Sequence, residues 1–231
     1  MTPERVRRIE VGLHAPQPCS RVVPVSVHPS KVAIMTTTPP VDDPRPVFAR
    51  AVDQAEKQVE AVRPDELGNS TPCADYDVRA LLGHMISVLY KIARVGAGGD
   101  AREIADVIDG IADTDWADAF TKARSDVERV WAADEMLDRM VTLPWATLPG
   151  RVALDAYTHE FTAHAWDLAH ATGRLSELDP DLAVRALDAF PKFAPPETRS
   201  GQGPFGPAIA VSADADAYIR LAAYLGRRPG R

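Results

Sequence analysis

The feature that most constrains the fold is a set of four segments in which apolar residues recur every three or four positions. This spacing matches the 3.6-residue turn of an α-helix and gives each segment one apolar face. Proline, glycine and short polar stretches separate the segments, so each helix must end before the next one begins. Because the apolar faces can be buried only against one another, we predict an all-α four-helix bundle.

The four predicted helices cover residues 47–62, 77–95, 115–133 and 150–171. Asp77 is placed to cap the second helix, and Gly173 is placed to end the fourth helix in a left-handed conformation. The segment "MVTLPWATLPG" before the fourth helix contains two prolines and indicates an extended connection. The core residues predicted for the first three helices are Phe48, Val52, Ala55, Val59, Val62, Val78, Leu81, Leu82, Met85, Ile86, Leu89, Trp116, Phe120, Ala123, Val127, Val130 and Trp131.

A short C-terminal appendage is predicted to follow the bundle. Asp179 and Pro180 form an N-cap followed by a first-turn proline, which starts a helix expected to stop near Pro191. A last helix is predicted from about residue 214 to residue 225, after a loop with one short strand. We therefore assign residues 44–195 to the helical bundle, and residues 196–231 to a C-terminal loop and helix packed on it.

The first 43 residues differ in composition from the rest of the chain. Residues 1–46 contain nine of the twenty prolines, and residues 1–40 carry a net charge of +3. Proline at this density prevents a helix, and the segment lacks the continuous apolar run of a secretory signal. We predict that residues 1–43 are a disordered basic leader, with Met35 as an alternative start of the chain.

Composition excludes several classes of function. The formal net charge of −7 argues against nucleic-acid binding, because phosphate contacts need a basic surface. No apolar run reaches the roughly 20 residues that span a membrane. Cys19 and Cys73 form neither a disulfide framework nor a C-x-x-C site, which favours a reducing compartment. We expect a cytoplasmic protein that acts on small molecules, with no nucleic-acid or membrane partner.

The segment "THEFTAHAWDLAHATG" (158–173) holds three of the six histidines. His159 and His164 are five residues apart, so they lie about 140° apart around a helix and cannot share one tetrahedral metal. This spacing excludes the H-E-x-x-H site of metalloproteases, whose histidines are four residues apart. His159 and His170 are predicted to face solvent, although Asp155 and His159 form a rival pair four residues apart.

Glu160 and His164 are four residues apart and lie on one face of the predicted helix. A carboxylate and an imidazole are ligands for zinc, iron or nickel, and His84, at the border of the apolar face of the second helix, is the candidate third ligand. Two simpler interpretations stay open on spacing alone. Glu160 and His164 would then be a surface pair, and His84 a hydrogen-bonded core residue.

Three segments resemble a known family. "TPCADYDVRALLGHM" is similar to the T-P-C-x-D-W-x-V-R-x-L-x-x-H-L segment of actinobacterial DinB-like proteins, which are related to mycothiol-dependent maleylpyruvate isomerase. "HEFTAHAWDLAHATGR" resembles that family's E/D-x-x-x-H-x-W-D-L-A-x-A-T-G segment. The closing "GPFGPAIAVSADADAYIRLAAYLGRRP" resembles the tail of an uncharacterised branch. The resemblance runs from Pro46 to Pro229.

The resemblance implies an antiparallel four-helix bundle with a divalent metal, usually zinc, at one end. It assigns the ligands to His84, Glu160 and His164, and thereby excludes the pair formed by Asp155 and His159. Tyr76 stands where the family usually has tryptophan, and Ala80 where it often has an acidic residue; neither is expected to touch the ligands. The chain after Ala194 does not resemble the larger C-terminal domain of the characterised isomerase, so no substrate carries over.

The predicted function is a mycothiol-dependent transferase or isomerase, in which the metal binds a small thiol that attacks an electrophilic substrate. Asp167 is a candidate to orient a ligand histidine, with a solvent-facing or packing acid as its alternative. Tyr157 and Tyr90 are possible proton donors, but no catalytic residue is assigned. A non-catalytic metal- or thiol-binding stress-response module and a homodimer with a structural metal are the alternatives.

Overall fold

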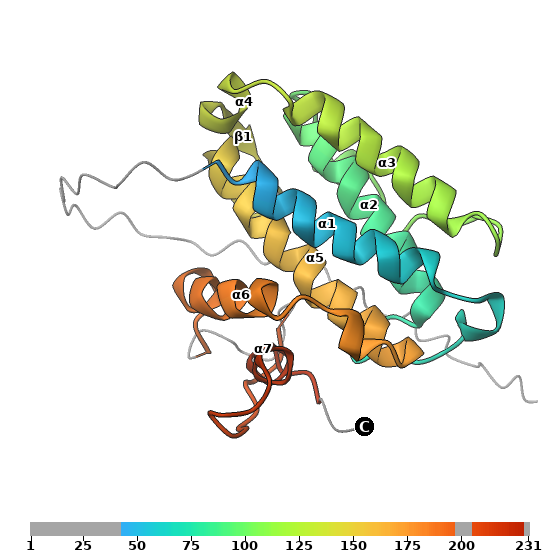
Figure 1. The fold of residues 1–231 in the computed structure, drawn as a ribbon. Helices are drawn as coiled ribbons and strands as arrows, with labels where there is room; N and C mark the ends of the chain where they lie inside the picture. The colour runs from blue at the N-terminus through green and yellow to red at the C-terminus, as the bar shows by residue number, and fades with distance from the viewer. Residues whose placement is uncertain (1–42, 197–204, 229–231) are drawn as a thin grey trace, which may run out of the picture.

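The computed structural model describes residues 43–196 and 205–228. Four long helices form the body of the fold: α1 (Arg45–Glu60), α2 (Val78–Gly96), α3 (Trp116–Trp131) and α5 (Gly150–Thr172) (Figure 1). The shorter elements are α4 (Glu135–Asp138), the strands β1 (Met140–Thr142) and β2 (Thr147–Pro149), and the helices α6 (Pro180–Phe193) and α7 (Ala217–Tyr224), with 3₁₀ turns at Pro64–Glu66, Ala101–Glu103 and Leu175–Glu177. The predicted all-α four-helix bundle is confirmed.

The bundle helices run in two opposite directions, α1 and α5 one way and α2 and α3 the other (Figure 1). Arg45 at the start of α1 donates to the carbonyl of Ala132 after α3 at 2.7 Å. Trp131 at the end of α3 donates from Nε1 to the carbonyl of Ile92 near the end of α2 at 3.1 Å. Because α2 and α3 are parallel, residues 97–115 must cross the length of the bundle between them.

Apolar residues from all four helices fill the centre of the bundle. Phe161 of α5 is buried between Phe48 of α1 and Phe120 of α3, with edge-to-face ring centroids 6.1 and 6.3 Å apart. Burying one such ring stabilises the fold by about 1.5–3 kcal/mol. The predicted core residues of α1, α2 and α3 are buried, except Val62 and Val130, which are partly buried. Helical periodicity therefore identified the inner faces of these helices correctly.

Helix boundaries follow the predicted caps with one exception. The Asp77 side chain accepts from Ala80 N at 2.8 Å, and Gly173 adopts φ +74°. The helix expected to stop near Pro191 ends two residues later, because α6 continues through this proline to Phe193. Proline in the last turn costs one backbone hydrogen bond, and the buried ring of Phe190 holds that turn against Tyr224.

The extended connection before α5 is an antiparallel hairpin that pairs Val141 with Leu148. The short strand expected in the loop before α7 is absent from residues 205–213, the described part of that loop; the rest of the loop and the leader lie outside the described residues. No helix in the described part of the chain is long and apolar enough to cross a membrane.

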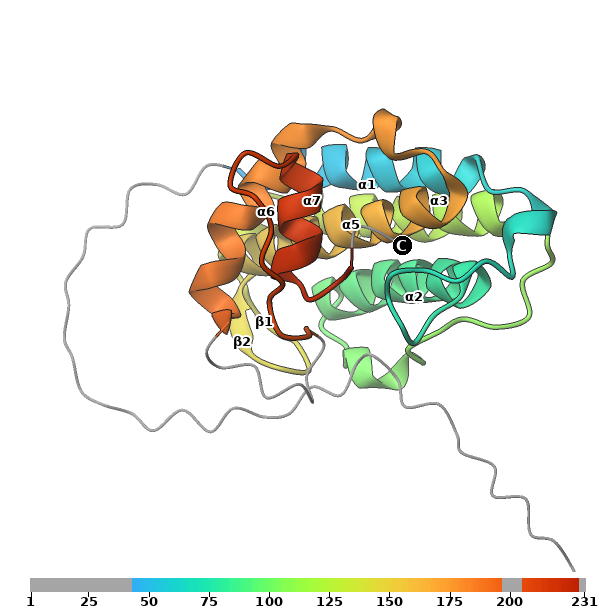
Figure 2. The same ribbon diagram turned by 90° about the horizontal axis from the view of Figure 1, so that it is seen from below.

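The C-terminal helices α6 and α7 pack beside α5 and α1 (Figure 2). A buried polar chain fixes them in place: Gln54 of α1 donates to the Tyr218 hydroxyl at 2.8 Å and accepts from the backbone of Asp179 at 2.6 Å. Beyond α7, Gly226 adopts φ +80° and its backbone passes close to that of Gly206. This turn directs Arg227 back toward α5.

Candidate metal centre

α5 carries two side chains of the predicted site on one face. Glu160 and His164 are one helical turn apart, and Glu160 Oε1 lies 3.3 Å from His164 Nε2. The Glu160 side chain is 34% exposed, whereas His164 is buried. The pair is therefore accessible to a small molecule only from the side of the carboxylate.

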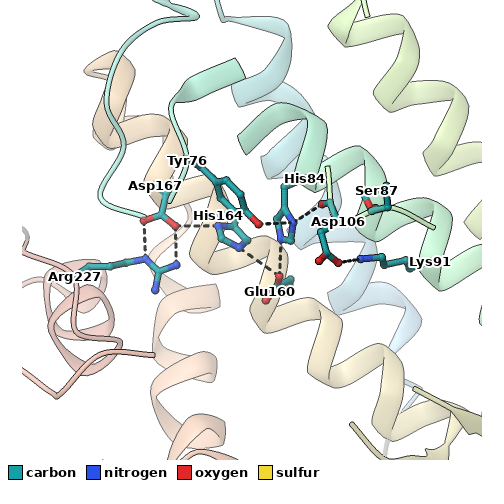
Figure 3. A network of polar contacts seen from close by, with 10 residues as sticks. Tyr76, His84, Ser87, Lys91, Asp106, Glu160, His164, Asp167 and Arg227 are labelled. Carbon is teal, nitrogen blue, oxygen red and sulfur yellow. Dashed lines mark hydrogen bonds and ion pairs between the residues drawn. The ribbon is translucent and has the colours of Figure 1, made fainter. Parts of the chain in front are cut away.

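α2 supplies the third side chain from across the bundle. Nε2 of His84 lies 3.2 Å from the same Glu160 oxygen, and His84 is buried (Figure 3). One nitrogen of each histidine and one oxygen of Glu160 all lie within 4.8 Å of one another. The structure thus brings together the three residues that the sequence singled out, and their donor atoms point toward a common centre.

His84 is held on its far side by the protein backbone. Its Nδ1 lies 3.0 Å from the carbonyl oxygen of Asp106, in the segment that crosses the bundle. Tyr76 stacks on the ring, with centroids 5.0 Å apart, and its hydroxyl lies 3.4 Å from Nδ1. The expectation that Tyr76 does not touch a ligand is wrong, because the turn before α2 folds back over His84.

His164 is held by two charged side chains. Its Nδ1 lies 3.0 Å from Asp167 Oδ2, and Asp167 accepts from Arg227 through both oxygens, at 2.7 and 2.9 Å (Figure 3). Asp167 is fully buried and Arg227 nearly so. The structure thus places Asp167 against a candidate ligand histidine, as the predicted orienting role would require, and adds Arg227 as the partner that neutralises it.

Burial and charge act in opposite directions on this cluster. Burial disfavours the charged form of His164, but the negative charges of Glu160 and Asp167 outweigh it and raise the pKa of His164 to about 10. Burial also raises the pKa of the Glu160 and Asp167 carboxyls. Neighbouring cations outweigh this effect and hold both pKa values below their usual range. The site therefore keeps two carboxylates ionised inside the fold.

The other histidines of α5 lie elsewhere. His159 is buried rather than solvent-facing, with its ring 5.8 Å from that of Phe190 and its Nε2 3.7 Å from Asp155. The predicted solvent position is wrong because α6 covers this face of α5. His170 is partly exposed and lies against Trp166. Neither histidine belongs to a three-residue metal-ligand group among the described residues.

Cys73 occupies a position that the sequence did not indicate. It is buried, and its sulfur lies within 4.8 Å of donor atoms of His164 and Asp167. This group could hold a metal in principle, but Arg227 and His164 already engage both Asp167 oxygens. In the group formed by His84, Glu160 and His164, the carboxylate is engaged by the two histidines themselves and not by an arginine, so this group is the better candidate.

Two supporting residues were missed by the sequence interpretation. Arg227 is 60 residues from Asp167, and Asp106 is 22 residues from His84 and contributes only a backbone carbonyl. No periodicity relates such positions, since both contacts depend on how connections fold over the bundle. Arg227 does fall within the quoted "GRRP" ending, which was the one available signal for it.

The fold and this cluster define an α-helical bundle with two histidines and a glutamate gathered between two of its helices. The sequence model described as "Mycothiol maleylpyruvate isomerase N-terminal domain" matches residues 48–169. The chain belongs to this family, as its motifs indicated, and all three candidate ligands and Asp167 fall within the matched region. Arg227 lies outside it.

The chain is also similar to two uncharacterised proteins of Mycobacterium tuberculosis, one from strain CDC 1551 / Oshkosh and one from strain ATCC 25618 / H37Rv. Each is 31% identical over 186 residues, which cover 80% of this chain and 98% of the relative. No solved structure matches the chain significantly. The relatives agree with an uncharacterised actinobacterial branch of the family.

Proposed function

We propose that the protein binds one divalent metal ion through His84, Glu160 and His164 and uses it to bind a small thiol such as mycothiol. The observation that carries this proposal is the convergence of two imidazole nitrogens and a carboxylate oxygen within 4.8 Å, from two facing helices. Zinc accepts this donor set, and nickel or iron would also fit it.

The donor set is incomplete in the way that a catalytic metal requires. Three protein ligands leave at least one coordination position for a water or a thiol. The partial exposure of Glu160 indicates the side from which such a molecule would approach. A bound divalent metal would lower the pKa of a coordinated thiol and so supply a thiolate at neutral pH.

The protein groups around the site have defined tasks in this proposal. Asp167 and the Asp106 carbonyl accept from Nδ1 of the two histidines, which leaves each Nε2 directed at the centre. Tyr157 lies three residues before Glu160 on α5, and burial and the nearby Glu160 charge raise its pKa. Its hydroxyl therefore stays protonated at neutral pH, so it can donate a hydrogen bond to negative charge that develops on a substrate.

The proposed reaction is addition of the thiol to a small electrophile such as an activated alkene or an epoxide. The sulfur forms a bond to carbon, and the electron pair displaced onto carbon or oxygen takes up a proton. If the product is retained, the reaction is a transfer; if the thiol is then eliminated, the result is an isomerisation.

Metal analysis tests the binding step. Purified protein is expected to carry close to one divalent metal per chain, and His84→Ala and His164→Ala are expected to abolish this content. His170→Ala is the matched control, because it removes a histidine of α5 outside the cluster. Full metal content in both ligand variants would overturn the assignment.

An electrophile screen, run with and without mycothiol, tests the chemistry. Consumption that requires the protein, the metal and mycothiol together supports a transferase or isomerase. Metal and thiol binding without consumption of any electrophile would instead indicate the non-catalytic module and would remove the enzymatic part of the proposal.

A further inference from the structure

The connection between α2 and α3, residues 97–115, contacts α2 beside His84. Ile108 N donates to the Gly83 carbonyl at 3.1 Å, and the Ser87 hydroxyl donates to the Ala105 carbonyl. Between these two contacts, the carbonyl of Asp106 lies 3.0 Å from His84 Nδ1. Residues 105–108, here called the crossing segment, therefore follow one turn of α2 around the histidine.

The identity of the acceptor fixes the position of a proton. A carbonyl oxygen only accepts hydrogen bonds, so the contact with Asp106 requires the hydrogen of His84 to be on Nδ1. The contact also turns Nε2, the other ring nitrogen, toward Glu160, whose Oε1 lies 3.2 Å away. A metal binds an imidazole through a nitrogen that carries no hydrogen, so a hydrogen held on Nδ1 makes Nε2 the nitrogen that would bind a metal.

Gly83 allows the crossing segment to come this close. A Cβ atom at this position would lie 2.5 Å from the carbonyl oxygen of Ile108 and 2.8 Å from a methyl group of Val107. The nearer atom belongs to the backbone, so rotation of a side chain cannot relieve the clash. Any larger residue must push the crossing segment away from α2.

We propose that the crossing segment, seated on Gly83, holds Nδ1 of His84 and so directs Nε2 at the candidate metal centre, and that Gly83 is a positioning residue of this centre. The inference rests on the proposed function for its consequence, which is tight metal binding. The Nδ1 hydrogen bond itself is a property of the fold and can be tested without metal.

Gly83→Ala and Gly96→Ala form a matched pair for the first test. Both glycines lie in α2, and a Cβ on Gly96 would meet the Trp131 and Val130 side chains at 2.6 Å, far from His84 in sequence. Both variants should lose stability. Only Gly83→Ala should weaken zinc binding, by roughly 10–100-fold, and alter the absorption spectrum of bound Co²⁺. Equal zinc affinity in the two variants would overturn the proposal.

Ser87→Ala is the milder variant in case Gly83→Ala fails to fold. It removes the hydroxyl contact with Ala105 without adding atoms, so it should loosen the crossing segment and weaken zinc binding in the same direction by less. Unchanged zinc affinity together with an unchanged Co²⁺ spectrum in this variant would count against the proposal.

Nitrogen-15 NMR of the metal-free protein separates this inference from the proposed function. In the native chain Nδ1 of His84 should carry a hydrogen that is bonded to a carbonyl, and in Gly83→Ala this hydrogen bond should be weakened or lost. His84→Ala identifies the signal. An Nδ1 without a hydrogen in the native chain would overturn the inference even if metal binds. A failure to bind metal with the hydrogen present on Nδ1 would instead overturn only the proposed function.

Discussion

The two histidines of the candidate metal centre meet the same glutamate oxygen but are supported by different kinds of group. His84 is supported by a neutral backbone carbonyl, 3.0 Å from its Nδ1. His164 is supported by the Asp167 carboxylate, also 3.0 Å from Nδ1, and by Arg227 behind it. A carbonyl fixes only direction, whereas a carboxylate also adds charge and makes the ring more basic.

The two candidate ligand histidines therefore depend on different parts of the chain. The His84 support belongs to the bundle and depends on backbone packing. The His164 support ends in Arg227, beyond α7, so the C-terminal appendage contributes directly to one ligand only. Substitutions on the charged side should therefore affect stability and metal binding together, and substitutions on the neutral side should mainly affect direction.

The largest effect is expected for Asp167→Asn. The substitution leaves the buried Arg227 cation without its counter-charge, which should lower the free energy of unfolding by about 3–5 kcal/mol and weaken metal binding roughly 10–100-fold. Urea denaturation of the metal-free protein and competitive zinc titration measure the two effects. Arg185→Gln is the control, because its partly exposed pair with Asp155 of α5 should contribute only about 0–1 kcal/mol. Equal losses would contradict the distinction.

A smaller loss is expected for Arg227→Gln. Asp167 keeps its bond to His164 but loses the charge-assisted pair with arginine, at a cost of about 1.5–3 kcal/mol in unfolding free energy. The neighbouring Arg228 is exposed, and Arg228→Gln should leave stability unchanged. Thermal and urea unfolding of both variants measure the difference. If both behave like the native protein, the tail does not support His164.

The histidine positions show what the sequence could and could not reveal. Glu160 and His164 were predictable because both lie on one helix, where a separation of four residues fixes their relation. The position of His159 was predicted wrongly because an amphipathic pattern assumes that one face of the helix is exposed to solvent. Over residues 158–169, α5 has almost no exposed face. α1, α2, α6 and α7 surround this part of the helix, and only Glu160 is partly exposed there.

The residues that contact the candidate ligands from behind were harder to predict from the sequence than the candidate ligands themselves. Helix boundaries and inner faces follow from local periodicity and caps, and these were largely right. The contacts of Tyr76, Asp106 and Arg227 arise in turns and connections, where no period relates a residue to its partner. Their positions depend on tertiary packing, such as the close approach that Gly83 permits.

The third expected effect is a dependence of stability and zinc affinity on pH. Because the pKa of His164 is raised to about 10, its charge stabilises the metal-free fold fully below about pH 6.5, and this contribution is lost as the pH rises toward 10. Metal must displace that proton, so zinc affinity should rise about tenfold per pH unit around pH 8. Calorimetry in buffers of different ionisation enthalpy should detect about one proton released per zinc ion. Binding without proton release would show that His164 is already neutral.

The smallest effect is expected for Tyr76→Phe, on the neutral side. The phenylalanine ring can keep the stacking on His84, and the hydroxyl is only a distant neighbour of Nδ1, at 3.4 Å against 3.0 Å for the Asp106 carbonyl. Loss of so long a contact should cost less than about 0.5 kcal/mol in stability, and zinc affinity should change by less than about threefold. Competitive zinc titration of Tyr76→Phe and Gly83→Ala, side by side, compares the losses of zinc affinity in the two variants. A loss as large as that of Gly83→Ala would show that the tyrosine, rather than the crossing segment, directs His84.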